Sequence, residues 1–531
     1  MKKGDILTGI ITDYDFPNKG SLFVCEENKQ NKNADKESAD SECHFKRSEE
    51  ASKRKVTIKG TLPGQKVQYR VTKRKAGMAE GCVLKVLERA PIEDIAPTCP
   101  HVDYCGGCTY TTMSYENQLA LKEQLVKKLL DKVLLKEGSN SADYRWEGIC
   151  ASPVDREYRN KMEYTFGDAY KEGPFTLGMH KKGGFYDIID VDGCELVKPE
   201  WSRIVRFTRD FFDQRKVPYY HRMRHEGVLR SLVVRQSRAT GEFLVNLVAT
   251  TQWEKYGFTS AGEDGIAESA SATDFKAMLK EYAEGLVRLS EDDTFSGSIA
   301  GVLYTENDTL GDVVQCDRME LLYGRDYITE EVLGLKFKVS PFSFFQTNTA
   351  GCEVLYSKAR EYIMDAVTGS GTREAYQGAS GSDSQGCGIL YDLYSGTGTI
   401  AQMMAPVAEK VYGIEIVEEA VVAARENAKS NVLDNCEFIS GDVLKALDDV
   451  ETKPDMIIVD PPRDGINPKA LTKILSYGVD NILYISCKPT SLARDLVTIT
   501  ASGYRVVRAC AVDQFPRTAN VETIVGIQKV S

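Results

Sequence analysis

The last third of the chain limits the possible folds most, because strand-like and helical segments alternate along it. Short apolar runs, typical of buried strands, occur as ILYDLYSG, KVYGIEI, CEFISGD, MIIVDPP and NILYISC. Between them, EEAVVAARENAKSN and NPKALTKILSYG carry apolar residues at helical spacing. This series predicts an α/β fold with a doubly wound parallel sheet, in which ligands bind at the carboxyl ends of the strands.

Acidic side chains accompany the first three of these strands. Asp392 precedes a turn that contains Gly396 and Gly398. Glu415 ends the second strand, where its carboxylate can accept hydrogen bonds from two ribose hydroxyls, and Asp442 follows the third, where an adenine ring would lie. The pattern favours a nucleoside-containing ligand. A generic nucleotide or dehydrogenase site is the alternative interpretation.

The fourth and fifth strands also end in chemically useful residues. Asp460 begins the sequence DPPR, in which two prolines fix the backbone; this sequence resembles the segment of methyltransferases that meets a planar base. Cys487 follows the fifth strand. A thiolate there can attack a pyrimidine, and we expect Lys488 and other nearby cations to favour that ionised form. Inert core packing is the alternative for this cysteine.

Three of the 14 cysteines are closely spaced, as Cys99-x5-Cys105-x2-Cys108, with a Gly-Gly pair between the last two. A disulfide framework is not expected in a chain of this length without a signal peptide, so the spacing predicts a metal or cluster site. It differs from the C-x3-C-x2-C pattern of radical enzymes. A cubane cluster needs a fourth thiolate, for which Cys150 and Cys82 are candidates from spacing alone, and zinc is the alternative to iron.

The rest of the chain predicts two further domains. Residues 1–90 contain short strands separated by Gly or Pro turns, which indicates a small β-barrel, with a polar, mobile insertion at 29–55. A helix at 115–134 opens a largely β central domain over 91–340. The third domain, 341–531, contains the strand series and a polar insertion at 369–388.

Charge is unevenly distributed along the chain. The net charge is −11, yet residues 1–90 hold 19 basic and 13 acidic side chains, a net of +6. Residues 53–75 carry nine Lys or Arg and no acid, and residues 221–238 carry five Arg and one Glu. Each strip predicts contact with a polyanion, with a solvated or salt-bridged face as the alternative. Since no apolar window approaches 18 residues, we expect a cytoplasmic protein without a membrane partner.

Together these motifs make the chain similar to the RNA uracil-5-methyltransferases, and within them to the iron-sulfur branch that modifies 23S ribosomal RNA. TLPGQKV resembles part of their TRAM domain, an OB-like RNA-binding barrel, and CPHVDYCGGC resembles their cluster motif. SPFSFFQTN, DLYSGTG, DPPRDG, SCKP and DQFPRTANVET occur in the family's order. The resemblance implies a class I methyltransferase fold, which is Rossmann-like, and a monomer.

The resemblance also implies roles for single residues. S-adenosylmethionine would be bound by Gln346, Tyr394, Glu415, Asp442 and Asp460, with Asp442 on the adenine side. Cys487 would be the nucleophile that adds to C6 of uracil, and Glu522 the base that removes the C5 proton. The [4Fe–4S] cluster would be held by Cys99, Cys105, Cys108 and Cys194.

Two positions depart from the family pattern. Lys488 stands where Asn is usual, and Asn520 stands where His is common, so no proton transfer can be assigned to position 520. Two other functions remain open from the sequence. One is the transfer RNA branch of the same chemistry, and the other is a non-catalytic RNA-binding protein with an iron-sulfur cluster.

Overall fold

The computed structural model describes residues 1–25, 53–75, 77–136, 139–184, 186–259, 273–311, 316–368, 387–443 and 452–530. These residues divide into two compact units. One consists of residues 1–96 and 112–125, and the other of residues 97–111 and 126–531. Most of both predicted insertions lies outside the described residues. None of the described helices is long and apolar enough to cross a membrane.

The first unit contains a sheet with the strand order β1-β5-β6-β4-β3-β2. Its strands are β1 (Ile6–Ile10), β2 (Asp13–Asp15), β3 (Lys19–Cys25), β4 (Lys53–Lys59), β5 (Lys66–Lys75) and β6 (Met78–Glu88). Ile11 and Thr12 connect the two edge strands, β1 and β2. The Ile11 N–H donates to the carbonyl of Gln65, which precedes β5, and the Thr12 N–H donates to the carbonyl of Ser21 in β3. One continuous segment therefore joins both edges, and the sheet closes into the predicted small barrel.

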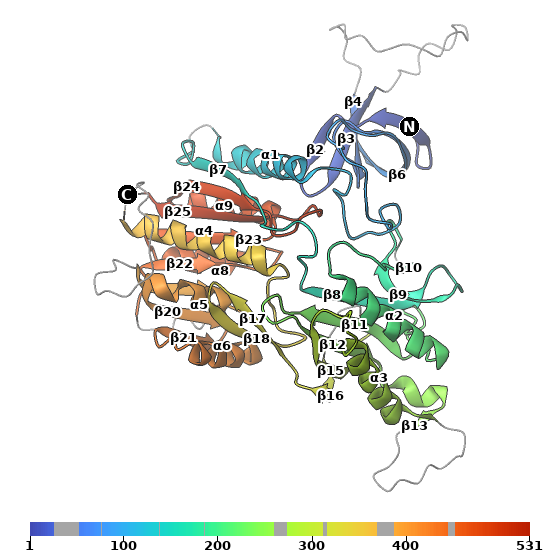
Figure 1. The fold of residues 1–531 in the computed structure, drawn as a ribbon. Coiled ribbons are helices and arrows are strands. Elements are labelled where there is room, and N and C mark those ends of the chain that lie inside the picture. The colour runs from blue at the N-terminus through green and yellow to red at the C-terminus, as the bar shows by residue number, and fades with distance from the viewer. Residues whose placement is uncertain are drawn as a thin grey trace, which may run out of the picture. The chain divides into compact units, whose positions relative to one another are not determined.

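The second unit contains a central sheet with the order β10-β9-β8-β11-β12-β15-β16 (Figure 1). Its strands are β8 (Lys161–Asp168), β9 (Phe175–His180), β10 (Ile188–Ile189), β11 (Leu229–Gln236), β12 (Glu242–Ala249), β15 (Ser298–Glu306) and β16 (Arg318–Gly324). Helices α2 (Pro199–Gln214) and α3 (Phe275–Ser290) cover one face, where Trp201, Phe212 and Tyr282 are buried. This apolar core leaves the opposite face of β8 and β11 for polar side chains.

The described residues before position 340 also contain one long helix and several short elements. They are the predicted helix α1 (Tyr115–Leu134), the 3-10 turn η1 (Gln252–Tyr256), and the strand pairs β13 (Phe258–Thr259) with β14 (Thr273–Asp274) and β17 (Ile328–Val332) with β18 (Leu335–Val339). The helix has the bounds that its apolar spacing predicts. The domain boundaries at 90 and 340 remain predictions.

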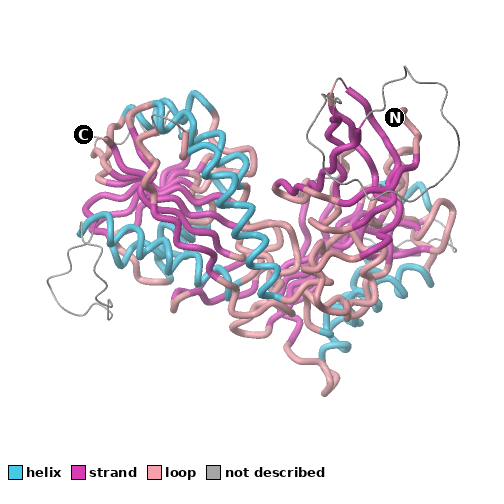
Figure 2. Tube along the Cα trace, turned by 90° about the horizontal axis from the view of Figure 1, so that it is seen from above, coloured by secondary structure: helices cyan, strands magenta, loops and turns pink. Residues whose placement is uncertain are grey.

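The second unit also contains a larger sheet, ordered β21-β20-β19-β22-β23-β25-β24-β7, with helices along both faces (Figure 2). Its strands are β7 (Arg145–Cys150), β19 (Cys387–Leu393), β20 (Ala408–Glu415), β21 (Cys436–Ser440), β22 (Met456–Val459), β23 (Asn481–Ser486), β24 (Tyr504–Val512) and β25 (Glu522–Lys529). Its helical elements are α4 (Thr349–Thr368), α5 (Thr399–Met404), η2 (Ala405–Val407), α6 (Glu418–Ser430), α8 (Pro468–Ser476) and α9 (Pro489–Ala501). The predicted α/β fold is confirmed.

Two strands give this large sheet its particular form. β25 runs antiparallel to both neighbours, β23 and β24, whereas β19 to β23 pair in parallel. β7 comes from the region before the central sheet and pairs in parallel with β24 at the edge. Sequence analysis did not predict the pairing of β7, because the two strands are separated by most of the chain.

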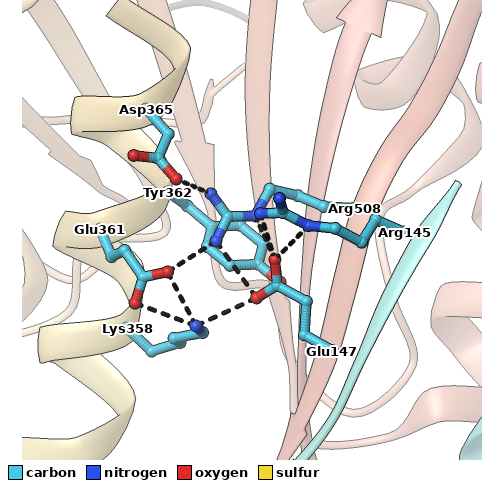
Figure 3. Close-up of polar contacts among 7 residues, drawn as sticks. All are labelled: Arg145, Glu147, Lys358, Glu361, Tyr362, Asp365 and Arg508. Carbon is cyan, nitrogen blue, oxygen red and sulfur yellow. Dashed lines mark hydrogen bonds and ion pairs between the residues drawn. The ribbon is translucent and has the colours of Figure 1, made fainter. Parts of the chain in front are cut away.

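A charged network fixes β7 and α4 to this edge of the sheet (Figure 3). Arg508 of β24 lies 3.0 Å from Glu147 of β7 and 2.8 Å from Glu361 of α4, and its guanidinium covers the ring of Tyr362 at 3.8 Å. Lys358 contacts Glu147 at 3.0 Å. Burial alone would raise the pKa of Glu147, but hydrogen bonds from Arg508 and Lys358 lower it to about 2. The carboxylate therefore stays ionised and paired at neutral pH.

Candidate active site

The carboxyl ends of neighbouring strands meet at one edge of the large sheet. The pairing of β20, β19 and β22 continues in register, so Glu415, Tyr394 and Asp460 lie at the same level along that edge. Glu415 also pairs with Ser440 of β21, and Asp442 follows two residues later with an exposed side chain. Four of the residues predicted to bind a nucleoside-containing cofactor are thus brought to one edge.

Glu415 organises the glycine turn that follows β19. One carboxylate oxygen accepts a hydrogen bond from the Gly396 N–H at 3.0 Å, and the other accepts from the Val417 N–H, also at 3.0 Å. Tyr394 adopts a positive φ of 69°, which is uncommon for a residue with a side chain. A carboxylate can accept further hydrogen bonds beyond these two. Glu415 can therefore shape the turn and still bind hydroxyl groups.

Gly398 is required by close packing at the start of α5. Its φ is +74°, and a Cβ atom there would lie only 2.5 Å from the ring of Phe438.

Asp392 lies within β19 rather than at its end and is fully buried. Burial and the nearby Asp460 raise the pKa of Asp392 well above its ordinary value. Of the three predicted strand-end acids, Asp392 is the one that does not reach the surface.

Cys487 and Glu522 are brought together by the antiparallel pairing of β23 with β25. Ser486, the last residue of β23, pairs with Thr523, so the next position along each strand places Cys487 opposite Glu522. Glu522 is 2% exposed, and its Oε2 atom has no hydrogen-bond partner among the described residues. Burial and the neighbouring Asp460 raise the pKa of Glu522 well above its ordinary value. This edge of the sheet therefore combines a thiol with buried carboxyl groups.

The expectation that nearby cations favour the Cys487 thiolate is wrong in this structure. Burial, followed by the charges of Glu522 and Asp460, raises the pKa of Cys487 to about 11, and the opposing effect of Arg463 is smaller. The Lys488 ammonium lies 3.9 Å from Asp464 and does not reverse the shift. Cys487 is therefore a thiol at neutral pH, because burial and the acids around it outweigh the effect of Arg463.

The DPPR loop is held in place by α9. Asp495 of that helix is buried, and its Oδ2 atom accepts hydrogen bonds from the Ile466 N–H at 2.9 Å and from the Tyr484 hydroxyl at 2.8 Å. Ser491 donates its hydroxyl to the carbonyl of Arg463 at 2.7 Å. These contacts fix the loop between β22 and α8, and with it Asp460 at the start of the loop.

The segment SPFSFFQTN lies beside the glycine turn. Its Gln346 is buried, its carbonyl accepts a hydrogen bond from Asn160 at 2.9 Å, and its side chain lies 3.5 Å from that of Gln514. Phe344 is 68% exposed, and its carbonyl accepts a hydrogen bond from Thr397 of the turn at 3.2 Å. Sequence analysis did not single out Phe344, although an aromatic ring in a motif beside the turn is the signal that could have found it.

Four of the described cysteines line one pocket, here called the cysteine pocket: Cys99, Cys105, Cys108 and Cys194. Burial raises the pKa of Cys108 to about 12, and the other three thiols add to the shift. The Gly107 N–H donates to Cys105 Sγ at 3.4 Å. Cys150 ends β7 and does not line this pocket, and Cys82 is exposed on β6 in the first unit. Among the described residues, however, no group of three or more His, Cys, Asp or Glu side chains is arranged so that it could hold a metal ion.

The wall of the cysteine pocket also holds the segment that precedes Glu522. The N–H groups of Thr109 and Tyr110, which follow Cys108, donate to the carbonyl of Arg517 at 2.8 and 3.0 Å. The Arg517 guanidinium lines the pocket and pairs with Glu195. The segment between β24 and β25 is therefore anchored to the loop of residues 99–110, which carries Cys99, Cys105 and Cys108. Sequence analysis did not predict this link.

The protonation state of Cys487 gives a direct prediction. Alkylation of Cys487 by iodoacetamide should be slow at neutral pH and should reach half its maximum rate near pH 11. Glu522→Gln should lower that midpoint by roughly one pH unit, because it removes a like charge that disfavours the thiolate. Mass spectrometry of each cysteine-containing peptide measures both rates, with the exposed Cys82 as the internal control. An unchanged midpoint in the variant would contradict the proximity of the two groups.

Comparisons with known proteins agree with this arrangement. The sequence profile described as tRNA (Uracil-5-)-methyltransferase matches residues 379–530. A protein of Caldanaerobacter subterraneus subsp. tengcongensis described as an uncharacterized RNA methyltransferase is 43% identical over 529 residues. This match covers 100% of this chain and 100% of that protein. A Clostridium tetani protein with the same description is 42% identical over 475 residues, which cover 90% of this chain and 93% of that one.

One solved structure matches nearly the whole fold. It is the tRNA (uracil-54, C5)-methyltransferase of Pyrococcus abyssi in complex with S-adenosyl-L-homocysteine, with a TM-score of 0.63 and 21% sequence identity. The match covers 98% of this chain and 100% of the other. At this identity the likeness concerns the fold alone.

Proposed function

The chain belongs to the RNA uracil-5-methyltransferase family, and from this premise we propose that it transfers a methyl group from S-adenosylmethionine to C5 of a uridine in 23S ribosomal RNA. The observation that carries the proposal is the register of β23 and β25, which sets Cys487 opposite Glu522 with Asp460 close enough to shift the pKa of both. A nucleophile and a base at one sheet edge are what this reaction needs.

The residues of the glycine turn fit the methyl donor. A Cβ atom at Gly396 would meet nothing within 4 Å, so the turn has open space beside it, and Glu415 keeps lone pairs for the ribose hydroxyls. Asp442 is exposed at the next strand end, where it would contact the adenine side. The Pyrococcus abyssi enzyme with the same fold was solved with S-adenosyl-L-homocysteine, the product form of this donor. Tyr394, Gln346 and Asp460 complete the proposed binding set.

The chemistry follows from the low reactivity of uracil C5. The Cys487 thiol gives its proton to water, and its Sγ bonds to C6 of the base, which makes C5 electron-rich. S-adenosylmethionine, when bound, would supply an electrophilic methyl group that bonds to C5 as S-adenosylhomocysteine leaves. Glu522 then accepts the proton from C5, the C5–C6 double bond re-forms, and the Cys487 thiolate leaves. The base has to leave its stack to reach this edge, and the exposed ring of Phe344 can stack against unpaired bases there.

We also propose that Cys99, Cys105, Cys108 and Cys194 hold a [4Fe–4S] cluster. Four thiols that line one pocket, and a backbone N–H directed at Cys105 Sγ, fit the donor set of such a cluster. Bound there, the cluster would cross-link the loop of residues 99–110. It would thereby make more rigid the loop whose Thr109 and Tyr110 N–H groups bind the Arg517 carbonyl. This cysteine set supports ribosomal RNA as the substrate, whereas the matching family profile is described by a transfer RNA activity.

Replacing the base should stop the reaction halfway. Glu522→Gln keeps the shape of the side chain but cannot accept the C5 proton, so attack by Cys487 and methyl transfer should still occur while elimination fails. A methylated protein–RNA conjugate should then accumulate, and turnover should fall by roughly 10²–10⁴-fold. Denaturing gel electrophoresis with methyl-labelled donor measures the conjugate.

The matched control is the same variant with Cys487→Ala added. The double variant should form no conjugate, because the atom that would bond to C6 is gone. Normal turnover by Glu522→Gln would show that another group is the base. A conjugate that survives the loss of Cys487 would show that another residue is the nucleophile.

The cluster proposal predicts the metal content of the purified protein. Prepared without oxygen, the chain should contain about four iron and four sulfide, since a cubane has that composition. Cys194→Ser should lower the iron content sharply, and Cys150→Ser, which changes a cysteine outside the pocket, should not. Elemental analysis decides both points. Zinc in place of iron, or iron loss in the Cys150 variant only, would contradict the proposed ligand set.

A further inference from the structure

A second pocket, here called the sheet pocket, lies on the central sheet and shares no lining residue with the cysteine pocket. Its floor is the pair of strands β8 and β11, where Thr165 pairs with Ser231. Tyr186 and Tyr219 line it as well, together with Arg222 and other residues of the loop before β11. None of these residues has a role in the proposed methyl transfer.

Two buried polar atoms in the sheet pocket lack partners. Ser231 is 5% exposed, and its Oγ atom has no hydrogen-bond partner among the described residues. The Nδ1 atom of His221, which lines the pocket from the loop before β11, is likewise buried without a partner among the described residues. Buried hydroxyl and imidazole groups nearly always have partners, so two unpaired ones in one pocket indicate a ligand that supplies hydrogen bonds.

The rim of the sheet pocket is aromatic and cationic. Tyr186 and Met223 are 59% and 66% exposed, and the Tyr186 hydroxyl contacts the Met223 sulfur at 3.5 Å. The Arg230 guanidinium lies 4.4 Å from the centre of the Tyr220 ring. Arg222 is exposed and lines the same pocket. Exposed rings beside arginine side chains are the surface on which unstacked bases bind.

The sheet pocket also explains the arginine-rich segment at 221–238. Arg235 is buried and donates to the carbonyls of Pro341 and Ser343, and Arg238 pairs with Glu353, so these two arginines are structural. Arg230 lines the sheet pocket but also donates to the carbonyls of Asn307, Thr309 and Gly311, so it is structural as well. Arg222, by contrast, is exposed at the pocket. The two interpretations of this segment, phosphate contact and salt-bridged structure, therefore apply to different parts of it.

We propose that the sheet pocket binds one unstacked nucleotide of the RNA substrate, at a position in the strand away from the methylated uridine. The tyrosines would stack on the base, Ser231 and His221 would bond to its edge, and Arg222 would face the backbone phosphate. Glu163 also lines the pocket, and its carboxylate disfavours a free anion while it can accept hydrogen bonds from the amino group of a base. This proposal rests on the proposed function and adds a second contact to its substrate.

Strand β8 connects the sheet pocket with the candidate active site. Asn160, which precedes β8, donates to the carbonyl of Gln346, and Thr165 on the same strand lines the sheet pocket. Five residues of extended strand span about 16 Å. A nucleotide in the sheet pocket would therefore lie near the methylated uridine in the strand but not next to it, and its binding would help to hold that uridine in place.

The test compares the double variant Tyr186→Ala, Arg222→Gln with the control Tyr170→Ala, Arg288→Gln. Tyr170 is 60% exposed and Arg288 is 64% exposed, and neither lines the sheet pocket. The Kd for a mixed-sequence single-stranded RNA of about 20 nucleotides should rise roughly tenfold in the pocket variant and stay unchanged in the control. With ribosomal RNA from a strain that lacks the protein, the pocket variant should show a higher KM and the same rate at saturation.

Photocrosslinking of the same RNA carrying 4-thiouridine gives a readout that does not depend on activity. Peptides containing Tyr186 or residues 219–222 should carry the crosslink in the unmodified protein. Equal Kd values in the pocket variant and the control, or crosslinks confined to other segments, would overturn the proposal. If no RNA is methylated but both the crosslink and the loss of affinity are found, the proposed function fails and the sheet pocket stands.

Discussion

The antiparallel insertion of β25 between β23 and β24 is the constraint on which the site depends. Because β25 runs against β23, its first residue lies at the edge where β23 ends, and Glu522 meets Cys487 there. Had β25 been parallel, Glu522 would begin at the opposite edge of the sheet. The segment that leads into β25 has to return along this edge, and the bonds from Thr109 and Tyr110 to Arg517 hold it there.

Buried carboxyl groups set the electrostatic character of the site. Burial and the neighbouring Asp460 raise the pKa of Glu522, and burial, followed by the charges of Glu522 and Asp460, raises the pKa of Cys487. An unpartnered atom such as Glu522 Oε2 costs folding free energy, and sites that retain such groups are commonly functional. Cys487, the proposed nucleophile, is therefore a thiol in this arrangement.

Local patterns predicted the parts of the molecule that depend on neighbouring residues. The strands of the last third and the helix at 115–134 follow from apolar spacing, and the glycine turn follows from two glycines after a buried strand. The pairing of β7 with β24 and the bonds to Arg517 join segments far apart in sequence, so no local signal contains them. The pKa of Cys487 could not be predicted either, because it depends on how deeply two distant carboxyl groups are buried.

The central claim is that this chain methylates uridine C5 in 23S ribosomal RNA. The most direct test isolates 23S ribosomal RNA and transfer RNA from otherwise identical strains with and without the gene, and measures 5-methyluridine in each by mass spectrometry of nucleosides. The account predicts that 5-methyluridine is lost from 23S ribosomal RNA, is kept in transfer RNA, and returns when the intact gene is restored. Unchanged 5-methyluridine in 23S ribosomal RNA, or a loss confined to transfer RNA, would contradict it.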